Sequence, residues 1–320
     1  MVIKKDKKYD VIGIGNAIVD LIAEVDDSFL EKIRIDKGGM SLVDYDVANK
    51  IEKEVKIIKT VSGGSVANSI VCMAQQGLKT VFVGKVNEDK LGVEFKEGLQ
   101  KEQVEFKFNP SSENKYTARC IILVTPDAER TMNTYLGVSQ ELSEKDVDMD
   151  AISDSSILYL EGYLWDLEDA KLAIKKSIIQ ARKSQTLVAF SISDAFCVDR
   201  FRKEFLDLVT NSADIIFANE AEIISLFQSK SIDESIDKCK SLNKIFVVTM
   251  GSEGALIINE NKVIKINPEK IDKLVDTTGA GDLFAAGFLS QYIKSQELEL
   301  SGKEGVKFAS KIIQKFGARL

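Results

Sequence analysis

The residues best suited to chemistry lie in the stretch DTTGAGDLFAAGFL, positions 276–289, which combines three glycines with two aspartates. The apolar repeat from Leu283 onward predicts a buried helix, and residues 279–281 would form the turn that leads into it. N–H groups at a helix N-terminus lack partners within the helix and lie at the positive end of its dipole. Glycine lets that backbone approach a bound group closely. The turn is therefore predicted to bind an anion.

This stretch does not match two familiar phosphate-binding motifs. The third glycine of G-x-G-x-x-G would fall on Phe284, and the stretch contains no Gly-Lys-[Ser/Thr], so the dinucleotide fingerprint and the P-loop are both excluded. The residues KLV before Asp276 indicate the end of a strand. An alternative interpretation is a glycine-rich turn whose aspartate only caps the helix.

The chain contains no histidine, which restricts its acid–base chemistry. A Ser-His-Asp triad, a histidine base and a histidine-ligated metal are all excluded. Any proton transfer must use Asp, Glu, Lys, Tyr or Cys. The cysteines are far apart and form no C-x-x-C motif, so they are predicted to be reduced and structural; they are Cys72, Cys120, Cys197 and Cys239.

Composition is that of an ordinary soluble globular protein, with 320 residues, 44% hydrophobic and 29% charged. The length allows one large α/β domain or two domains. A net charge of −7 argues against general nucleic-acid binding, which needs clustered basic residues. No segment has the length of a membrane span or the form of a signal peptide. We therefore expect a cytoplasmic protein that acts on a small molecule.

Apolar strand-like runs alternate with helical stretches over most of the chain, which predicts a parallel sheet covered by helices on both faces. The expected strands are 9–15, 80–86, 156–162, 186–192, 213–219 and 244–251, and the expected helices include 66–77, 167–184 and 219–228. In such sheets ligands bind beyond the C-terminal ends of the strands. Polar residues at strand exits are therefore expected to form the site.

Two segments, of about 16–45 and 105–136, depart from this alternation and indicate β-rich structure. We predict that they form a small sheet that folds over one edge of the core as a lid. Such a lid would keep water away from a transferable phosphate. The whole chain, 1–320, is expected to be one domain that carries this lid.

The residues at strand exits form a set with a specific order. They are Asn16 and Asp20; Gly63, Gly64 and Asn68 in SGGSVANS; Asn219 and Glu222 in NEAE; Thr249, Gly251 and Gly254 in TMGSEG; and Asp282. This set resembles the ribokinase-like carbohydrate and nucleoside kinases, or PfkB family, over essentially the whole chain. The segment SGGSVANSIVCMAQQGLKTVFVGKVNEDKLG is similar to the family's N-terminal signature, and DTTGAGDLFAAGFL to its C-terminal one. The resemblance implies a three-layer α/β/α core with a mostly parallel sheet and a small β lid.

The resemblance gives the opening stretch a role in phosphoryl transfer from ATP. Backbone N–H groups of Gly279, Ala280 and Gly281 would form an anion hole for charge that develops on the γ-phosphate. Asp282 would accept the proton of the attacking hydroxyl. A Cβ atom at the glycines would crowd the phosphate.

The resemblance also assigns residues to the acceptor. Asp20, four residues after Asn16, would bind a vicinal diol of a sugar; the alternative is a turn residue at a strand end. Gly63, Gly64 and Asn68 would contact the substrate, where glycine allows a close approach of the backbone. The alternative for the glycines is a simple tight turn.

On the nucleotide side, Asn219 and Glu222 match the family's N-x-x-E motif, in which the glutamate would act on Mg²⁺ through water. The alternative is a helix N-cap with an acid in the first turn. The remaining nucleotide-binding candidates follow the last strands or precede the opening turn; they are Thr249, Gly251, Gly254 and Thr278. Glycine-rich turns after strands are also common for structural reasons alone.

Arg130 lies on the predicted lid, at the position of an arginine that clamps phosphate charge in adenosine kinases. The alternative is an exposed strand arginine. Potassium activation, which occurs in parts of the family, stays open, as does the choice between monomer and homodimer.

Several segments resemble adenosine kinases more than ribokinases or fructokinases; they are GNAIVD, SGGSVANS, DAERTMNTYL and the run from Ser191 to Glu222. The predicted acceptor is therefore the 5′-hydroxyl of adenosine. Thr278 stands where eukaryotic adenosine kinases usually have Asn, and Asp194 where they have Ala, so a free sugar or another nucleoside stays open. A nucleotide-binding sensor without turnover is a third hypothesis, but a sensor would not need the base Asp282.

Binding of a purine requires apolar or aromatic walls. The candidates are Met40, Tyr116, Cys120, Met132, Tyr163 and Trp165. The alternative for each of them is ordinary packing in the core or the lid.

Overall fold

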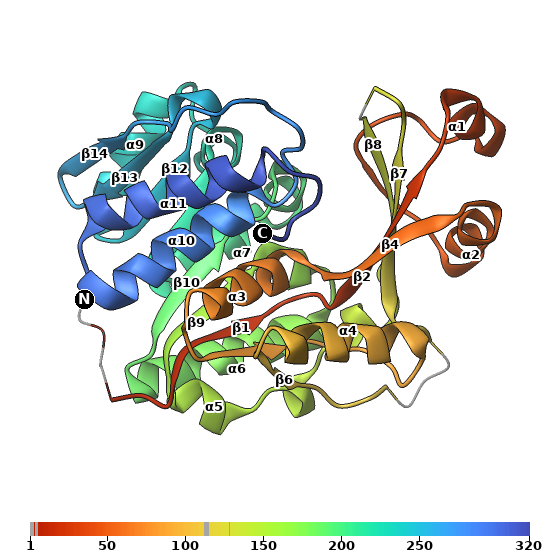
Figure 1. Cartoon of the computed structure of the whole chain (residues 1–320). Coiled ribbons are helices and arrows are strands. Elements are labelled where there is room, and N and C mark those ends of the chain that lie inside the picture. The colour runs from red at the N-terminus through yellow and green to blue at the C-terminus, as the bar shows by residue number, and fades with distance from the viewer. Residues whose placement is uncertain (1–2, 4–5, 112–114, 128) are drawn as a thin grey trace.

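A computed structural model of the chain shows a large sheet between two layers of helices and a smaller sheet that projects to one side (Figure 1). The structure describes residues 3, 6–111, 115–127 and 129–320. The strands are β1 Tyr9–Ile14, β2 Ile18–Glu24, β3 Met40–Leu42, β4 Ile57–Gly63, β5 Thr80–Val83, β6 Glu105–Lys107, β7 Ala118–Val124, β8 Arg130–Tyr135, β9 Ser155–Glu161, β10 Leu187–Ser191, β11 Ile215–Asn219, β12 Ile245–Thr249, β13 Ala255–Asn259 and β14 Lys262–Ile266.

The helices alternate with these strands over most of the chain. The α-helices are α1 Asp27–Ile33, α2 Tyr45–Glu54, α3 Ser65–Gln75, α4 Lys90–Lys101, α5 Met149–Ser153, α6 Glu168–Ser184, α7 Ala195–Asn211, α8 Glu220–Phe227, α9 Ile232–Lys240, α10 Ala280–Ser295 and α11 Leu298–Ile312. Short 3₁₀ helices are η1 Gly137–Glu141, η2 Glu144–Asp146, η3 Gly162–Asp166 and η4 Gly251–Glu253. No helix in the described part of the chain is both long and apolar enough to cross a lipid bilayer.

Among the described residues, nine strands form the large sheet in the order β14-β13-β12-β11-β10-β9-β1-β5-β6. All neighbours from β6 to β12 pair in parallel, and only β12, β13 and β14 pair antiparallel. The expected mostly parallel sheet is therefore confirmed. From β1 the chain builds outward first through β5 and β6 and then, from β9, in the other direction. Ligands of open α/β sheets bind at such a switch point.

Both faces of the large sheet are buried beneath helices. Successive side chains of a strand point to opposite faces, so neighbouring residues of β1 belong to different core clusters. Val11 belongs to a core cluster with side chains of α3, α4, α10 and α11. Its neighbour Ile12 belongs to a second cluster with α5, α6, α7, α8 and α9. The predicted three-layer arrangement is thus the observed one (Figure 1).

The smaller sheet has the order β3-β8-β7-β2-β4 among the described residues, and its composition differs from the prediction. Residues 57–63 add β4, which was missed because its sequence IIKTVSG lacks apolar alternation, and Gly63 is its one buried residue. Residues 105–107 form β6 and pair with β5 in the large sheet, where Phe106 packs on Phe82 and Phe95. A short helix, α1, interrupts residues 16–45, and residues 112–114 and 128 lie outside the described residues.

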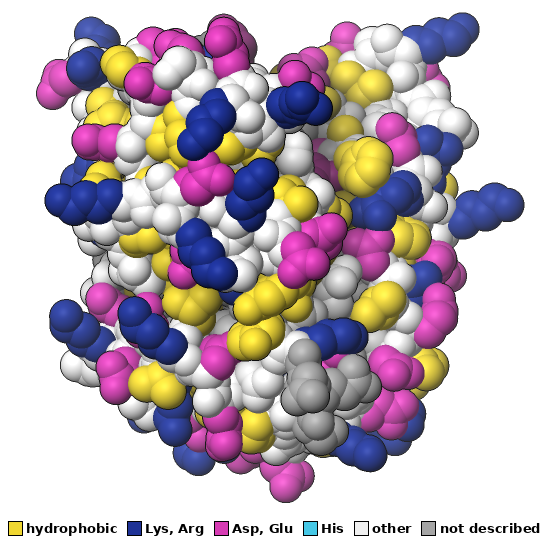
Figure 2. All heavy atoms as spheres, turned by 90° about the vertical axis from the view of Figure 1, so that its right-hand side faces the viewer, with side chains coloured by type: hydrophobic (Ala, Val, Ile, Leu, Met, Phe, Trp, Pro, Cys, Tyr) yellow, Lys and Arg dark blue, Asp and Glu magenta, His cyan; other side chains and the backbone are white. Residues whose placement is uncertain are grey.

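The smaller sheet has one face toward the core and one face covered by its own helices. Val19 and Leu21 of β2 are buried in the same cluster as Leu30 of α1 and Ala48 of α2. Acidic and basic side chains are interspersed over the outer surface on this side of the molecule (Figure 2). The face that is not covered by α1 and α2, which is the face toward the core, is available to line a cavity. That this sheet closes as a lid stays a prediction.

The prediction that KLV ends a strand is wrong, because residues 267–277 form no strand. The N–H groups of Val275 and Asp276 both donate to the carbonyl of Ile313, at 2.8 and 3.1 Å. One carbonyl next to the end of α11 therefore satisfies the donors that a neighbouring strand would otherwise have satisfied. The glycine turn before α10 follows a loop and is fixed by this contact.

Candidate active site

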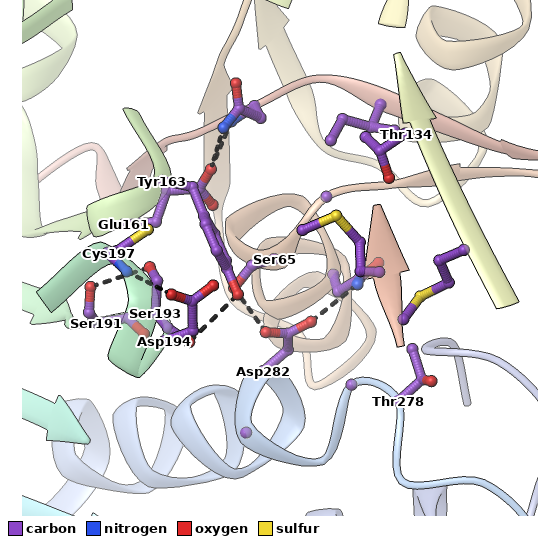
Figure 3. Close-up of a pocket in the computed structure, with 18 of the residues that line it drawn as sticks. Ser65, Thr134, Glu161, Tyr163, Ser191, Ser193, Asp194, Cys197, Thr278 and Asp282 are labelled. Atoms are coloured by element: carbon purple, nitrogen blue, oxygen red, sulfur yellow. Dashed lines mark hydrogen bonds between the residues drawn. The ribbon is translucent and has the colours of Figure 1, made fainter. Parts of the chain in front are cut away.

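A cavity of about 930 Å³ lies at the C-terminal ends of the parallel strands, between the large sheet and the smaller one. Its lining includes residues that follow or end β1, β9, β10, β11 and β12, residues of the two glycine turns, and the core-facing side chains of the smaller sheet. Most of the strand-exit residues named from the sequence line this cavity. Glu161, Tyr163, Asp194 and Asp282, which come from separate elements, face the same space in Figure 3.

Asp282 is the third residue of α10, and its side chain does not cap that helix. The N-cap is Gly279, whose φ of 77° is left-handed. The carboxylate of Asp282 instead accepts from Ser65 Oγ at 2.6 Å (Figure 3). It also accepts from Asn68 Nδ2 at 2.9 Å, and both donors lie on α3. Its backbone carbonyl accepts from Ser69 Oγ at 2.8 Å. The capping alternative is thus not what is observed; α3 holds the carboxylate toward the cavity.

The surroundings of Asp282 favour a proton acceptor. Desolvation raises the pKa of Asp282, and the hydrogen bonds from Ser65 and Asn68 oppose that rise. A general base works best when its pKa approaches the operating pH. The half-buried carboxylate therefore combines a more basic oxygen with a fixed orientation.

The turn before α10 leaves open space where an anion could bind. Gly279, Ala280 and Gly281 all line the cavity. A Cβ atom at Gly281 would have nothing within 4 Å, whereas one at Gly279 would lie 2.6 Å from Cβ of Ala318. The N–H of Ala280 already donates to the carbonyl of Thr277 at 3.1 Å. Gly281 is therefore the position where the helix end is most accessible to a ligand.

Asp20 lies within β2, so it is not the strand-end turn residue that the alternative envisaged. Desolvation raises its pKa to about 6, and the charges of Arg130 and Arg319 oppose this. A Cβ atom at Gly63 would lie 2.5 Å from Oδ2 of Asp20, so this glycine is required by the carboxylate beside it. Gly64 has a φ of 100° and stands against the carbonyl of Asn16.

Glu161, the last residue of β9, is a cavity-lining residue that the sequence prediction missed. It is fully buried, and its carboxylate accepts from Asn16 N at 2.8 Å, Asn16 Nδ2 at 3.1 Å and Val66 N at 2.9 Å. It therefore joins the exit of β1 to the first turn of α3. Its position at the exit of an expected strand was a signal that could have found it. Desolvation raises its pKa to about 7.

Replacement of Glu161 by glutamine is expected to change the pH dependence of stability. Between pH 4.5 and about 7 the folded protein keeps the proton of Glu161 and the unfolded chain has lost it, so the free energy of unfolding falls as pH rises. Relative to the unaltered protein, Glu161→Gln should gain on the order of 3 kcal/mol between pH 5 and pH 8. Urea unfolding at both pH values measures this difference. Parallel pH profiles for the two proteins would contradict the assignment.

Asn219 and Glu222 form a capping box at the start of α8, which is the structural alternative for this pair. Asn219 Oδ1 accepts from Glu222 N at 2.9 Å, and the glutamate accepts from Asn219 N and Nδ2 at 2.9 and 2.6 Å. Both residues also line the cavity, and burial raises the pKa of Glu222 to about 7. Among the described residues no cluster of three or more His, Cys, Asp or Glu could hold a metal. A role on Mg²⁺ through water stays a prediction.

Two of the other four nucleotide-binding candidates line the cavity and two do not. Thr249 and Thr278 line the cavity, whereas Gly251 and Gly254 lie outside its lining. Gly254 has a φ of 89° and stands against the carbonyl of Ile266, so a tight turn alone requires it. This is the structural alternative for that glycine.

Arg130 is neither exposed nor part of the cavity lining. Its side chain is 9% exposed and forms an ion pair with Asp276, whose own side chain is 4% exposed. Asp276 also accepts from Thr278 N at 2.9 Å and Gly317 N at 2.8 Å. The predicted phosphate clamp is thus held beside the anion turn by a carboxylate. Its contact with phosphate stays a prediction.

The apolar candidates also divide into two groups. Met40, Cys120, Met132 and Tyr163 line the cavity. Tyr116 instead stacks on Tyr45 at 4.4 Å between ring centroids. Trp165 is buried in the core, and its Nε1 donates to Glu204 at 2.9 Å. For these two residues the packing alternative holds.

Phe196, in the first turn of α7, lines the cavity and was missed by the sequence prediction. It is 65% exposed, and the guanidinium of Arg200 lies 4.5 Å from its ring centroid. Asp194, one of the two departures from eukaryotic adenosine kinases, is the N-cap of α7 and accepts from Cys197 N at 2.6 Å. The exposed aromatic ring thus stands on a well-capped helix end.

Comparison with known proteins gives a match over almost the whole chain. The family model described as pfkB family carbohydrate kinase matches residues 14–320. A probable sugar kinase from Rhizobium etli CFN 42 has a similar structure, with a TM-score of 0.90, 40% identity, and coverage of 98% of this chain and 95% of that one. Adenosine kinase from Sinorhizobium meliloti gives a TM-score of 0.90 and 39% identity, with 98% and 96% covered. Adenosine kinase of Schizosaccharomyces pombe is 24% identical, over 98% of this chain and 96% of the relative.

Proposed function

The chain belongs to the pfkB family of carbohydrate kinases, and we propose that it transfers the γ-phosphate of ATP to the 5′-hydroxyl of a nucleoside, with adenosine as the acceptor. The family makes it a kinase. One observation carries the proposed chemistry: the carboxylate of Asp282 is held by α3 directly beside the open N-terminal turn of α10.

The proposed reaction uses these two features together. As the acceptor oxygen forms a bond to the γ-phosphorus and the bond to the ADP oxygen breaks, Asp282 takes the proton of the hydroxyl. Negative charge on the transferring group is stabilised by the backbone at Gly279 and Gly281. Ser65 and Asn68 keep the carboxylate oriented, and one of their hydrogen bonds must yield to the incoming hydroxyl.

The division of the cavity into polar and apolar parts supports a nucleoside as the acceptor. Asp20, Asn68 and the backbone at Gly64 supply groups that bind ribose hydroxyls. The core-facing side of the smaller sheet supplies apolar side chains, and η3 and α7 supply aromatic ones; together they are Met40, Leu42, Ile122, Met132, Tyr163 and Phe196. A free sugar would leave this apolar part unfilled, whereas a purine would fill it.

Magnesium would enter with the phosphates of ATP. Mg²⁺ in kinases usually keeps several waters and contacts one or two carboxylates besides the phosphates. Both oxygens of Glu222 already accept hydrogen bonds from Asn219, so this residue fits a contact through water and not direct ligation. When bound, the ion would neutralise charge on the phosphates.

Phe196→Ala is expected to raise KM for adenosine about tenfold, because stacking of a base on an aromatic ring contributes about 1–3 kcal/mol. KM for ATP and the melting temperature should change little, since the ring is 65% exposed. Phe316→Ala is a matched control, because Phe316 is 55% exposed and outside the cavity lining. Steady-state kinetics with both substrates measure the effect. An unchanged KM for adenosine would remove this ring from the base site.

A sugar kinase is the second candidate, and the 40% identical relative named a probable sugar kinase favours it. ADP release with Mg-ATP should be measured against adenosine, inosine, ribose, fructose and a blank without acceptor. Higher kcat/KM for adenosine than for either sugar supports the nucleoside proposal. A preference for a sugar would keep the role of Asp282 and overturn the acceptor. Absence of ADP release with every acceptor would favour a nucleotide-binding sensor without turnover.

A further inference from the structure

Residues 317–320 follow α11 and run between the N-terminal ends of α10 and α3, where the C-terminal end is marked in Figure 1. The N–H of Gly317 donates to Asp276 at 2.8 Å, and Ala318 packs against Gly279. These contacts fix the segment to the anion turn. Its next residue, Arg319, reaches the other glycine turn of the cavity.

The guanidinium of Arg319 holds both ends of the turn that carries Gly64 and Ser65. Nε donates to the carbonyl of Ser62 at 3.1 Å, and a terminal nitrogen donates to the same carbonyl at 2.5 Å. The other terminal nitrogen donates to the carbonyl of Ala67 at 3.1 Å. Asn68, which contacts Asp282, follows directly. One side chain thus connects the end of β4 with the first turn of α3.

Arg319 also brings a positive charge close to the acidic groups of the cavity. It faces Asp20 on β2, Asp282 on α10, Cys72 on α3 and Glu102 at the end of α4. Desolvation lowers the pKa of Arg319 to about 10, so the side chain stays charged at neutral pH. Its charge in turn lowers the pKa of both Asp20 and Asp282.

Other groups act on the same two carboxylates from neighbouring elements. Arg130 on β8 lowers the pKa of Asp20, and Asp282 raises it. Ser65 and Asn68 donate to Asp282. The charge of Asp282 also raises the pKa of Glu161. Within the part of the chain that the structure describes, Arg319 is the cation that acts on both Asp20 and Asp282 and also binds the acceptor turn.

We propose that Arg319 is a positioning residue of the kinase: its hydrogen bonds hold residues 62–68 against the anion turn, and its positive charge acts on the carboxylate that accepts the proton. This inference rests on the proposed role of Asp282 as the base. A merely structural contact would affect folding and rate alike at every pH, and would not move the pH at which activity is lost on acidification.

The test compares Arg319→Gln, which keeps a hydrogen-bond donor and loses the charge, with Arg319→Lys, which keeps the charge. With the best acceptor, kcat/KM should fall roughly tenfold or more in the glutamine variant. The acidic limb of its pH profile of kcat/KM should move upward by about 0.5 to 1 pH unit, because a nearby cation no longer stabilises the charged form of the Asp282 carboxylate. The lysine variant should keep the limb of the unaltered protein.

Hydrogen exchange supplies a readout that does not depend on turnover. Amides of residues 62–68 should exchange faster in both variants, while those of α11 stay protected. Arg182→Gln is a matched control, because Arg182 also donates to two backbone carbonyls, those of Asn211 and Ser212, away from the cavity. It should change neither readout.

An acidic limb that stays in place in Arg319→Gln overturns the proposal, and so does unchanged exchange across residues 62–68. These failures differ from failure of the proposed function. If the unaltered protein turns over no acceptor, the kinase proposal for this site fails, and hydrogen exchange still decides whether Arg319 holds the turn. If Arg319→Gln does not fold, hydrogen exchange across residues 62–68 in Arg319→Lys decides the proposal.

Discussion

Asp282→Asn is expected to reduce kcat about a thousandfold, because a positioned general base contributes about 10²- to 10⁴-fold and asparagine cannot take the proton. The substitution preserves shape, and Ser65 can still donate to the side-chain oxygen of asparagine. Nucleotide binding should therefore stay within about threefold, since asparagine adds no bulk beside the phosphate. Rapid-quench turnover and calorimetric titration with ATP measure the two quantities separately.

The control for this substitution is Asp26→Asn, at the N-cap of α1 on the far side of the smaller sheet. Asp26 accepts from Phe29 N at 2.8 Å, and asparagine caps a helix about as well as aspartate. The control should keep full turnover. Equal activity of the unaltered protein and Asp282→Asn would remove Asp282 from proton transfer, whereas loss of both turnover and nucleotide binding would indicate a structural role.

Gly281→Ala is expected to lower kcat/KM for ATP by a hundredfold or more without loss of stability. The position has a negative φ and open space around an added Cβ, so the fold can accept a methyl group. Alanine in a helix is preferred over glycine by up to about 1 kcal/mol, so the melting temperature should hold or rise. The methyl group would instead occupy the space of the phosphate. Alanine keeps its backbone N–H, but a displaced phosphate would lose contact with the turn, and loss of one such contact in an oxyanion hole costs about 10²- to 10³-fold.

Gly279→Ala gives the opposite pattern and serves as the comparison. Gly279 has a φ of 77°, and a Cβ there would lie 2.6 Å from Cβ of Ala318. Strain of this kind costs about 1–3 kcal/mol, so this variant should lose stability as well as activity. Thermal unfolding together with kinetics distinguishes the two glycines. Full activity of Gly281→Ala would show that no phosphate comes close to this turn.

The fold was predictable where local pattern determines it. Each core strand that the sequence predicted pairs in parallel in the large sheet. In the run 213–219, for example, the four consecutive apolar residues 215–218 are all buried, which is typical of a strand covered on both faces. The smaller sheet was predicted less well, since its edge strand β4 shows no apolar alternation and only one of its residues, Gly63, is buried. Local pattern also placed KLV in a strand, although its partner is a single distant carbonyl, that of Ile313.

The site was predictable as far as its motifs reach. Asp282 and Asn68, which two separate motifs supply, meet at 2.9 Å across 214 positions of sequence. Glu161 belongs to no such motif, and Phe196 was not singled out within the run from Ser191 to Glu222, although both lie at or shortly after the exits of expected strands. Arg319 gave no local signal, because its contacts with Ser62 span 257 positions. Pairing over such distances is a property of the folded chain.

Phosphorus NMR of a reaction with Mg-ATP and adenosine tests the central claim most directly, because it reports which oxygen receives the phosphate. We expect a phosphomonoester signal that grows in step with ADP and is split into a triplet by the two 5′ protons of the ribose. A doublet would place the phosphate on a secondary hydroxyl and contradict the proposed geometry. Absence of any phosphomonoester from adenosine, with ATP consumed only when a free sugar is supplied, would contradict the nucleoside assignment itself.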